Sequence, residues 1–383
     1  MKNIYLDMQP TWSRKTGIGW YTYKIAEGLV KNKKNCYIGG LFNPLGIRKI
    51  ERVNGLRYRE MKYFWPYYNF YGFFSKKIFK WKFLKFNNIT NTNCMIYHFF
   101  NFTIPKKIKG KIITTIHDTI HKEVKEGIDF DIDKFDEEII YSLEKSDVVV
   151  TVSNSAKQDI IKYYGNKYAE KIRIVEPGVN LEEYNRPLIL NKKEEMFSKI
   201  RVSKESEIIF TIGTLQKRKN IVNIIKAYNF YKDKNLNSKL VLVIAGNPGV
   251  GYDEIIKEYE ASKYKENIKI LHYISEEEKI LLYKLAKIFV FPSLYEGFGM
   301  PIVEAMAAGV PVITSNISSM PEVAREAALI VNPYSVEDIC SAIEKYDLNE
   351  NLRKEKIKLG YSQCRNYTWK NAVEKMEKIY EEL

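Results

Sequence analysis

The chain has 383 residues, a length that favours two domains of similar size, and its 45% hydrophobic and 28% charged residues exclude a disordered, collagen-like or mucin-like protein. Its 61 Lys and Arg against 47 Asp and Glu give a net charge of +14, which favours an anionic partner. The four cysteines have no C-x-x-C spacing and no apolar run reaches the ~18 residues of a membrane span, so we expect a cytoplasmic protein without disulfides or a zinc ribbon.

Short β-branched runs alternate with helical patterns through the first half of the chain, as in parallel sheets with crossover helices. Helices are predicted over 131–145, from its apolar spacing, and over 156–164, after the capping sequence Ser153-Asn154-Ser155. The predicted strands are 3–6, 37–41, 95–98, 112–116, 148–152 and 172–175.

After Pro177-Gly178-Val179-Asn180 the chain is polar and charged until about Glu207, and this stretch is predicted to connect the domains before the alternation restarts. The fold class is therefore α/β, with two Rossmann-like domains over 1–185 and 186–365, and ligands expected at the carboxyl ends of the strands. A last amphipathic helix is expected over about 366–383. The strands of the second half are predicted at 208–212, 240–245, 268–272, 288–291, 310–314 and 328–331.

Residues 48–88 differ in composition from the rest, with eleven Lys or Arg against two Glu and a high density of aromatic residues. Such a mixture can dock on an anionic membrane surface, stack on nucleic-acid bases, or form the core of a helical insertion whose lysine stems surround the aromatics. The composition leaves these three interpretations open.

The strongest motif runs from Pro292 to Val312, where a buried strand ends, a glycine turn follows and a helix begins. A helix N-terminus of this kind suits a phosphate, Glu304 can accept hydrogen bonds from a diol such as a ribose, and Glu296 can reach a sugar hydroxyl. The alternative is a helix-capping glutamate and a surface glutamate without a ligand. The backbone amides that would face the ligand belong to Gly297, Phe298, Gly299 and Met300.

This segment resembles the E-x7-E signature of the retaining GT-B glycosyltransferases of family 4. The resemblance extends over nearly the whole chain, with residues 45–90 matched least. The sequence Gly213-Thr-Leu-Gln-Lys-Arg218-Lys219-Asn220 is similar to the phosphate-binding loop of mannosyltransferase-like members. Further matches are Gly17-Ile-Gly19-Trp20, Ile116-His117-Asp118, Thr151-Val-Ser153-Asn-Ser155 and Val175-Glu-Pro177-Gly178-Val-Asn180.

The resemblance implies a nucleotide-sugar donor, a GT-B fold whose final helix crosses back to the first domain, and a role for each matched residue. Lys219 and Arg218 would bind the diphosphate, and Thr214 stands where many members carry an arginine. Glu304 would bind the ribose, and Glu296 and His117 the transferred sugar. Gly17 and Gly19 would allow close approach of the donor, Tyr273 and Ile274 would contact the base, and His98 and Asp118 would lie on the acceptor side.

The D-x-D sequence Asp129-Phe-Asp131-Ile-Asp133 is interpreted as the start of a helix and not as a metal site, and no cofactor is expected. The hypothesis is a retaining, metal-independent transfer of a hexose to a glycan or lipid-linked glycan. The first choice of hexose is mannose, with GDP-mannose as its donor. A UDP-sugar transferase is the alternative, and an epimerase, a phosphorylase or a non-catalytic basic protein that binds membrane or nucleic acid also remains open. An enzyme of this kind would be cytoplasmic and peripheral on the inner face of the plasma membrane, docked through residues 48–88.

Overall fold

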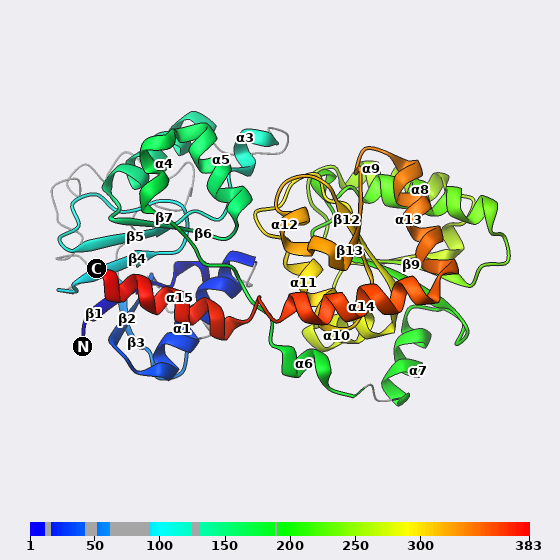
Figure 1. Ribbon diagram of the computed structural model, residues 1–383, viewed down its shortest axis with the longest axis horizontal. Coiled ribbons are helices and arrows are strands. Elements are labelled where there is room, and N and C mark those ends of the chain that lie inside the picture. The colour runs from blue at the N-terminus through cyan, green and yellow to red at the C-terminus, as the bar shows by residue number, and fades with distance from the viewer. Residues whose placement is uncertain (12–16, 43–51, 62–91, 125–130, 188–189) are drawn as a thin grey trace. The chain divides into compact units, whose positions relative to one another are not determined.

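The structure is a computed structural model that describes residues 1–11, 17–42, 52–61, 92–124, 131–187 and 190–383. Its described residues form two compact units (Figure 1). The first contains the chain up to His121, the part that ends at Pro177, and the last segment Trp369–Leu383. The second is built from Gly178–Thr368.

The first unit contains a parallel sheet of seven strands in the order β3-β2-β1-β4-β5-β6-β7. Because β2 and β4 lie on opposite sides of β1, the chain reverses its direction of winding between β1 and β4. In open α/β sheets such a switch point is where ligands bind, outside the carboxyl ends of the strands. The strands are β1 (Asn3–Asp7), β2 (Cys36–Phe42), β3 (Arg57–Met61), β4 (Ile96–Phe99), β5 (Lys111–Thr115), β6 (Val148–Thr151) and β7 (Ile172–Ile174).

Helices cover both faces of this sheet, with α4 and α5 on one face and α1 and the C-terminal α15 on the other (Figure 1). The α15 helix packs on α1 and is fastened at its end by the Lys2 ammonium, which donates to the Tyr380 carbonyl at 2.7 Å. The buried Glu377 carboxylate of α15 pairs with Lys34 at 2.9 Å. The elements are η1 (Gln9–Thr11), α1 (Gly17–Asn32), α3 (Ile120–Glu123), α4 (Ile132–Lys145), α5 (Asn154–Tyr164), η3 (Asn166–Lys171) and α15 (Trp369–Glu382).

The second unit contains a parallel sheet of six strands in the order β10-β9-β8-β11-β12-β13, with its switch point between β8 and β11. Its strands are β8 (Glu207–Ile212), β9 (Leu240–Ala245), β10 (Ile268–Leu271), β11 (Ala286–Phe291), β12 (Val312–Ser315) and β13 (Ala328–Val331). Its helices are α6 (Leu181–Asn185), α7 (Leu190–Lys199), η4 (Lys217–Lys219), α8 (Ile221–Lys234), α9 (Tyr252–Ala261), η5 (Lys265–Asn267), α10 (Glu276–Leu285), α11 (Met300–Ala307), α12 (Met320–Ala324), η6 (Arg325–Ala327), α13 (Val336–Leu348) and α14 (Glu350–Cys364).

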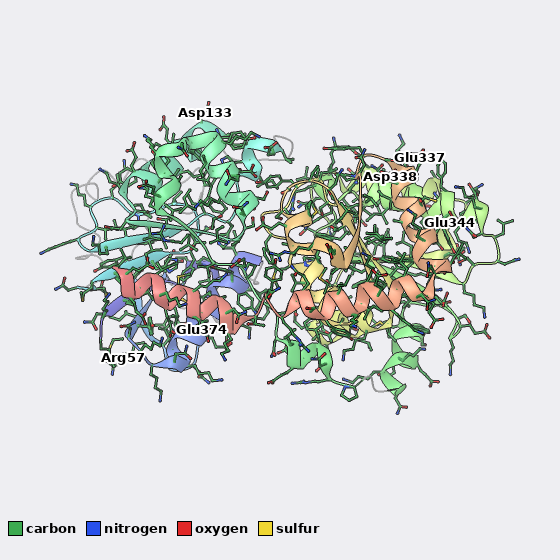
Figure 2. All side chains as sticks on the ribbon, viewed as in Figure 1. Arg57, Asp133, Glu337, Asp338, Glu344 and Glu374 are labelled. Atoms are coloured by element: carbon green, nitrogen blue, oxygen red, sulfur yellow. The ribbon has the colours of Figure 1, made fainter. Side chains whose placement is uncertain are left out.

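The helix ends follow the charge pattern of the sequence. Ser335 caps α13 by accepting from the Asp338 amide at 3.1 Å, and Glu337 and Asp338 lie in the first turn, where the helix dipole favours acidic groups (Figure 2). Asp131 and Ser153 cap α4 and α5 as the sequence predicted. The D-x-D sequence therefore includes the cap of α4, while its first two residues lie outside the described residues.

Three features of the structure differ from the expectations. The stretch predicted as a polar connection contains the helices α6 and α7, and the units change at 177/178 and 368/369 where the sequence predicted 185/186 and 365/366. The strand β3 was not predicted, because its sequence Arg-Tyr-Arg-Glu-Met is polar and lies at the edge of the sheet.

The basic aromatic segment 48–88 lies mostly outside the described residues, so its three interpretations stay predictions. Among the helices in the described ranges, none is both long enough and apolar enough to span a bilayer.

Candidate active site

Two loops meet at the switch point of the second unit, one after β8 and one after β11. The Arg218 carbonyl accepts from the Leu294 amide at 2.8 Å. Asn220 adopts a left-handed conformation with φ of 60°, and its side-chain amide donates to the carbonyls of Pro292 at 3.1 Å and Pro333 at 2.6 Å. These bonds hold the phosphate-binding loop predicted from the sequence against the start of the E-x7-E segment.

A buried ion cluster joins the same loops. Glu296 is 9% exposed, and its carboxylate oxygens lie 2.5 Å from the Lys219 ammonium and 2.7 Å from the Arg218 guanidinium. Burial alone would raise the pKa of Glu296, but the charges of Lys219 and Arg218 outweigh it and lower this pKa to about 2. Two cations and one carboxylate leave a net positive charge at the carboxyl ends of β8 and β11, which suits a diphosphate.

The stem of Lys219 is held in place by its surroundings. Its ammonium lies 4.8 Å from the centre of the Phe291 ring. A Cβ atom at Gly213 would lie 3.1 Å from the Lys219 stem, and Gly213 has a φ of +154°. Glycine at this position therefore leaves room for the lysine beneath the loop.

The turn after Glu296 leads into α11. Gly299 precedes this helix in a left-handed conformation, with a φ of 98°. The buried hydroxyl of Ser319 donates to the carbonyls of Glu296 and Phe298, both at 2.8 Å, and the Ser318 hydroxyl also donates to the Glu296 carbonyl at 2.6 Å. The carbonyls of this turn face the two serines. The backbone amides of Gly297 to Met300, which were predicted from the sequence to face a ligand, lie at the N-terminus of α11.

Glu304 lies one turn into α11 and is the centre of a second polar cluster. Its carboxylate accepts from the Lys279 ammonium at 2.9 Å and from the Tyr283 hydroxyl at 2.9 Å. Burial would lower the pKa of Lys279, but the charges of Glu304 and Glu276 raise it, so the lysine is charged. Burial and the Glu304 charge also raise the pKa of Tyr184.

Sequence reasoning missed Lys279, Tyr283 and Tyr184. The signal for two of them is local: a capping box at Ser275 fixes the start of α10, and Lys279 and Tyr283 are four residues apart on one face of this helix. Each Glu304 oxygen has two lone pairs and accepts one of these bonds, so the carboxylate retains the capacity to accept from a ligand.

The predicted base-binding residues lie farther along the same edge of the sheet. Tyr273 is 62% exposed and, with Ile274, connects β10 to the cap of α10. Thr214 is exposed in the loop after β8. The described contacts thus bring together Arg218, Lys219 and Glu296, whereas β9 separates the Tyr273 loop from β8.

His117 follows β5 in the first unit and is held by two elements of that unit. Its Nε2 atom lies 2.8 Å from the Phe100 carbonyl, and the Tyr21 ring of α1 packs edge-on at 5.2 Å between centroids. Burial lowers the pKa of His117 to about 4, so the ring is neutral at pH 7. Because a carbonyl only accepts, Nε2 carries the proton and Nδ1 is the acceptor nitrogen.

His98 was predicted on the acceptor side, and its position corrects that prediction. The side chain is completely buried, with Nδ1 2.7 Å from the Tyr380 hydroxyl of α15 and Nε2 2.8 Å from the Thr115 hydroxyl. It therefore fastens the C-terminal helix to the sheet and does not reach a binding surface. Asp118 accepts from the Ile120 amide at 3.1 Å, at the start of α3.

Gly17 and Gly19 lie in the first turn of α1 and not in a free glycine loop. A Cβ atom at Gly17 would meet nothing within 4 Å among the described residues, so none of them requires glycine there. Among the residues that the structure describes, no three His, Cys, Asp or Glu side chains are grouped for a metal ion.

The buried neutral His98 predicts an acid-sensitive contribution to stability. Burial and the nearby His117 lower the pKa of His98 from 6.5 to about 3, so between these pH values the unfolded chain binds a proton that the native chain does not. The contribution is fully present above pH 6.5 and is lost as the pH falls toward 3. Urea unfolding of His98→Gln should therefore give a free energy of unfolding that falls less than in the wild type between pH 7 and 4.5.

The comparison with the variant is needed because Asp7 acts in the opposite direction: burial raises its pKa from 3.8 to about 7. The difference between wild type and variant in the free energy of unfolding, followed over pH, isolates the contribution of His98. The same pH dependence in His98→Gln and wild type would contradict the prediction.

Comparisons with known proteins identify the family that the chain resembles. The family described as "Glycosyl transferases group 1" matches residues 192–363, and that described as "Glycosyltransferase Family 4" matches residues 15–183. The chain is 29% identical to O-antigen chain mannosyltransferase B of Escherichia coli over 289 residues, 75% of this chain and 74% of that protein. It is 30% identical to O-antigen chain mannosyltransferase RfbU of Salmonella typhimurium over 208 residues, 54% of this chain and 52% of that protein.

The fold is also found in solved structures. Sucrose-phosphate synthase from Thermosynechococcus elongatus superposes with a TM-score of 0.78 at 16% identity, covering 100% of this chain and 99% of that one. Together with the two parallel sheets, this likeness establishes the GT-B fold.

Proposed function

Because the chain belongs to the family 4 glycosyltransferases of the GT-B fold, we propose that it transfers mannose to a hydroxyl of a glycan or lipid-linked glycan, with GDP-mannose as the preferred donor. The observation that carries the proposal is the cluster of Lys219, Arg218 and Glu296 at the switch point of the second unit. Mannose is supported by the names of the relatives. A UDP-sugar remains the alternative donor.

In this proposal the diphosphate of the donor binds Lys219, Arg218 and the amides at the start of α11. Cleavage of the sugar–phosphate bond leaves growing negative charge on the β-phosphate, and cations already fixed in place stabilise that charge most in the transition state. The diphosphate competes with Glu296 for both cations, and the released carboxylate then accepts from a hydroxyl of the transferred sugar.

Glu304 is proposed to bind the ribose diol while Lys279 and Tyr283 hold its carboxylate in position. His117 is proposed to accept a hydrogen bond from a sugar hydroxyl at Nδ1, since its Nε2–H donates to the Phe100 carbonyl. Retention of the anomeric configuration would follow from attack on the face that the phosphate leaves, with the departing phosphate oxygen taking the acceptor proton. No metal is proposed, because the lysine and arginine supply the positive charge.

Thermal unfolding with GDP, UDP, ADP, TDP and their sugars, with magnesium or with EDTA, tests the donor. A ligand at 100 times its dissociation constant stabilises the native protein by about 2.7 kcal/mol, so we expect a clear rise in Tm with GDP and GDP-mannose that EDTA does not abolish. A rise with UDP alone would replace mannose by a UDP-sugar, and a rise that requires magnesium would contradict metal independence. Absence of any rise would contradict the donor site.

A transfer assay with the stabilising sugar then tests the reaction. Proton NMR of the product gives the configuration of the new linkage, and an inverted anomeric centre would contradict the proposed mechanism.

A further inference from the structure

Asp7 occupies a position in the first unit that corresponds to the phosphate-binding loop of the second. It is the last residue of β1, and the winding of the seven-stranded sheet reverses between β1 and β4. In the second sheet the reversal lies between β8 and β11, and the loop after β8 carries Arg218 and Lys219. A side chain at the carboxyl end of β1 is therefore at the first unit's own ligand position.

The Asp7 carboxyl group is buried with little to bind it. It is 9% exposed, and among the described residues its side chain accepts one hydrogen bond, from the Gln9 amide nitrogen at 3.3 Å. A carboxylate has about four acceptor positions, and buried polar groups in native proteins are usually hydrogen-bonded. The carboxyl group thus retains acceptor capacity that the described part of the chain does not use.

A donor without a partner lies two residues away. The side-chain Nε2 atom of Gln9 is buried and has no hydrogen-bond partner among the described residues. Gln9 begins the short helix η1, whose position is fixed because the Met8 amide donates to the Gly40 carbonyl at 2.9 Å and the Thr11 hydroxyl donates to the Met8 carbonyl at 2.7 Å. These bonds hold the backbone that carries both groups. An unused donor two residues from an acceptor with spare capacity indicates a ligand with hydroxyl groups, because a hydroxyl both donates and accepts.

The charge around Asp7 argues against a phosphate at this point. Burial raises the pKa of Asp7 to about 7, the hydrogen bond from Gln9 opposes this rise, and no cationic side chain of the described residues contributes. A phosphate would meet a carboxyl group for which the described part of the chain supplies no compensating cation. A neutral hydroxyl can accept a hydrogen bond from the protonated group and can donate one to the ionised group.

We infer that Asp7 and Gln9 form a sugar-hydroxyl binding site at the carboxyl end of β1, which positions the transferred sugar or the acceptor sugar for the reaction. The inference rests on the proposed function for the choice of a sugar among neutral polyols.

Binding of methyl glycosides tests the site without any requirement for activity. Ligand-observed NMR titration with the methyl α-glycosides of mannose, glucose and galactose should show Asp7→Asn weakening the preferred glycoside by about tenfold, through loss of a charge-assisted hydrogen bond. The same variant should bind GDP, or whichever nucleoside diphosphate raises the Tm, like the wild type. Asp133→Asn is the matched control, since Asp133 is an exposed carboxylate of α4 (Figure 2).

A deoxy series separates contact from a structural role. Removing the contacted hydroxyl from the glycoside should weaken binding to the wild type but not to Asp7→Asn, whereas a structural role would leave the deoxy penalty equal in both proteins. If Asp7→Asn lowers the Tm enough to unfold the protein at 25 °C, Gln9→Ala provides the same comparison from the donor side. Equal glycoside affinity in wild type and a folded variant, or an unchanged deoxy penalty, overturns the inference.

Kinetics identify which sugar occupies the site. A rise in the acceptor KM assigns the acceptor sugar, and a fall in the hydrolysis of the nucleotide sugar without acceptor assigns the transferred sugar. Both results support the site. A wild type that binds the glycoside through Asp7 but transfers no sugar would refute the proposed function and leave this inference standing.

Discussion

Lys219→Met is expected to lower kcat by about 10²- to 10³-fold, the size of effect seen when one preorganised group at a developing negative charge is removed. Methionine has a similar length, so it retains the contact of the lysine stem with Phe291 and the packing under Gly213. What it removes is the positive charge 2.5 Å from Glu296. The measurement is steady-state transfer of the sugar that stabilises the protein in thermal unfolding.

Loss of the Lys219 charge also changes Glu296. With Arg218 as its remaining partner, the carboxylate loses one of the two charges that lower its pKa, so this pKa rises from about 2 toward its ordinary range. A group whose pKa is lowered in the native state adds stability above its unfolded pKa, and this stability is lost as the pH falls. The variant should therefore be less stable at pH 7 and should lose less stability on acidification.

Lys217→Met is the matched control for this experiment. Lys217 lies two residues earlier in η4 and is exposed, so the substitution removes one charge from the same short helix without touching the Glu296 cluster. Its kcat should stay within about twofold of the wild type, in line with the small effects of surface substitutions. A kcat of Lys219→Met similar to that of Lys217→Met would refute the leaving-group role of Lys219.

The fold could be predicted because strands buried on both faces have continuous apolar sequences. The strand at Leu240–Ala245, in which every residue is buried, has the bounds that the sequence predicted. The strand β3 and the helix α7 could not be predicted in this way. Their sequences are polar, and they become ordered through neighbours that local periodicity does not reveal, such as the pairing of β3 with β2.

The site was predicted at the level of motifs but not of contacts. Spacing placed Glu296 and Lys219 in functional segments, yet their ion pair joins positions 77 residues apart, and no local pattern contains it. The contact of His98 is even harder to predict from local sequence, since its partner Tyr380 lies 282 residues away. A histidine at a strand end is compatible with a ligand contact and with a core hydrogen bond, and the position of α15 decides between them.

Asp7 shows the reverse case. The sequence offers no motif around it, and its significance comes from the strand order and from a buried carboxyl group with unused hydrogen-bonding capacity. Strand order is a property of the whole sheet, so a switch point cannot be assigned before the neighbours of β1 are known.

Glu304→Gln is expected to weaken binding of the nucleoside diphosphate by about 1 to 3 kcal/mol, roughly 5- to 150-fold, because hydrogen bonds from the ribose to a charged acceptor are replaced by bonds to a neutral amide. Glutamine has the same size, and its carbonyl oxygen can still accept from Tyr283. The measurement is calorimetric titration of wild type and variant with GDP, or with the nucleotide that thermal unfolding selects.

A 2′-deoxy nucleotide makes the test specific for the ribose. The wild type should bind 2′-deoxy-GDP more weakly than GDP, and Glu304→Gln should lose most of that preference, since the 2′-hydroxyl of GDP has no charged partner in the variant.

Glu276→Gln is the control that separates the ligand contact from the Lys279 network. Glu276 pairs with the same lysine at 2.8 Å, but it lies three residues before Lys279, at the start of α10, and its side chain is 60% exposed. If Glu304 acts only by fixing Lys279, both variants will weaken GDP binding and both will retain the preference for GDP over 2′-deoxy-GDP. Loss of the preference in Glu304→Gln alone would assign the ribose to Glu304, because only a group that contacts the diol distinguishes the two nucleotides.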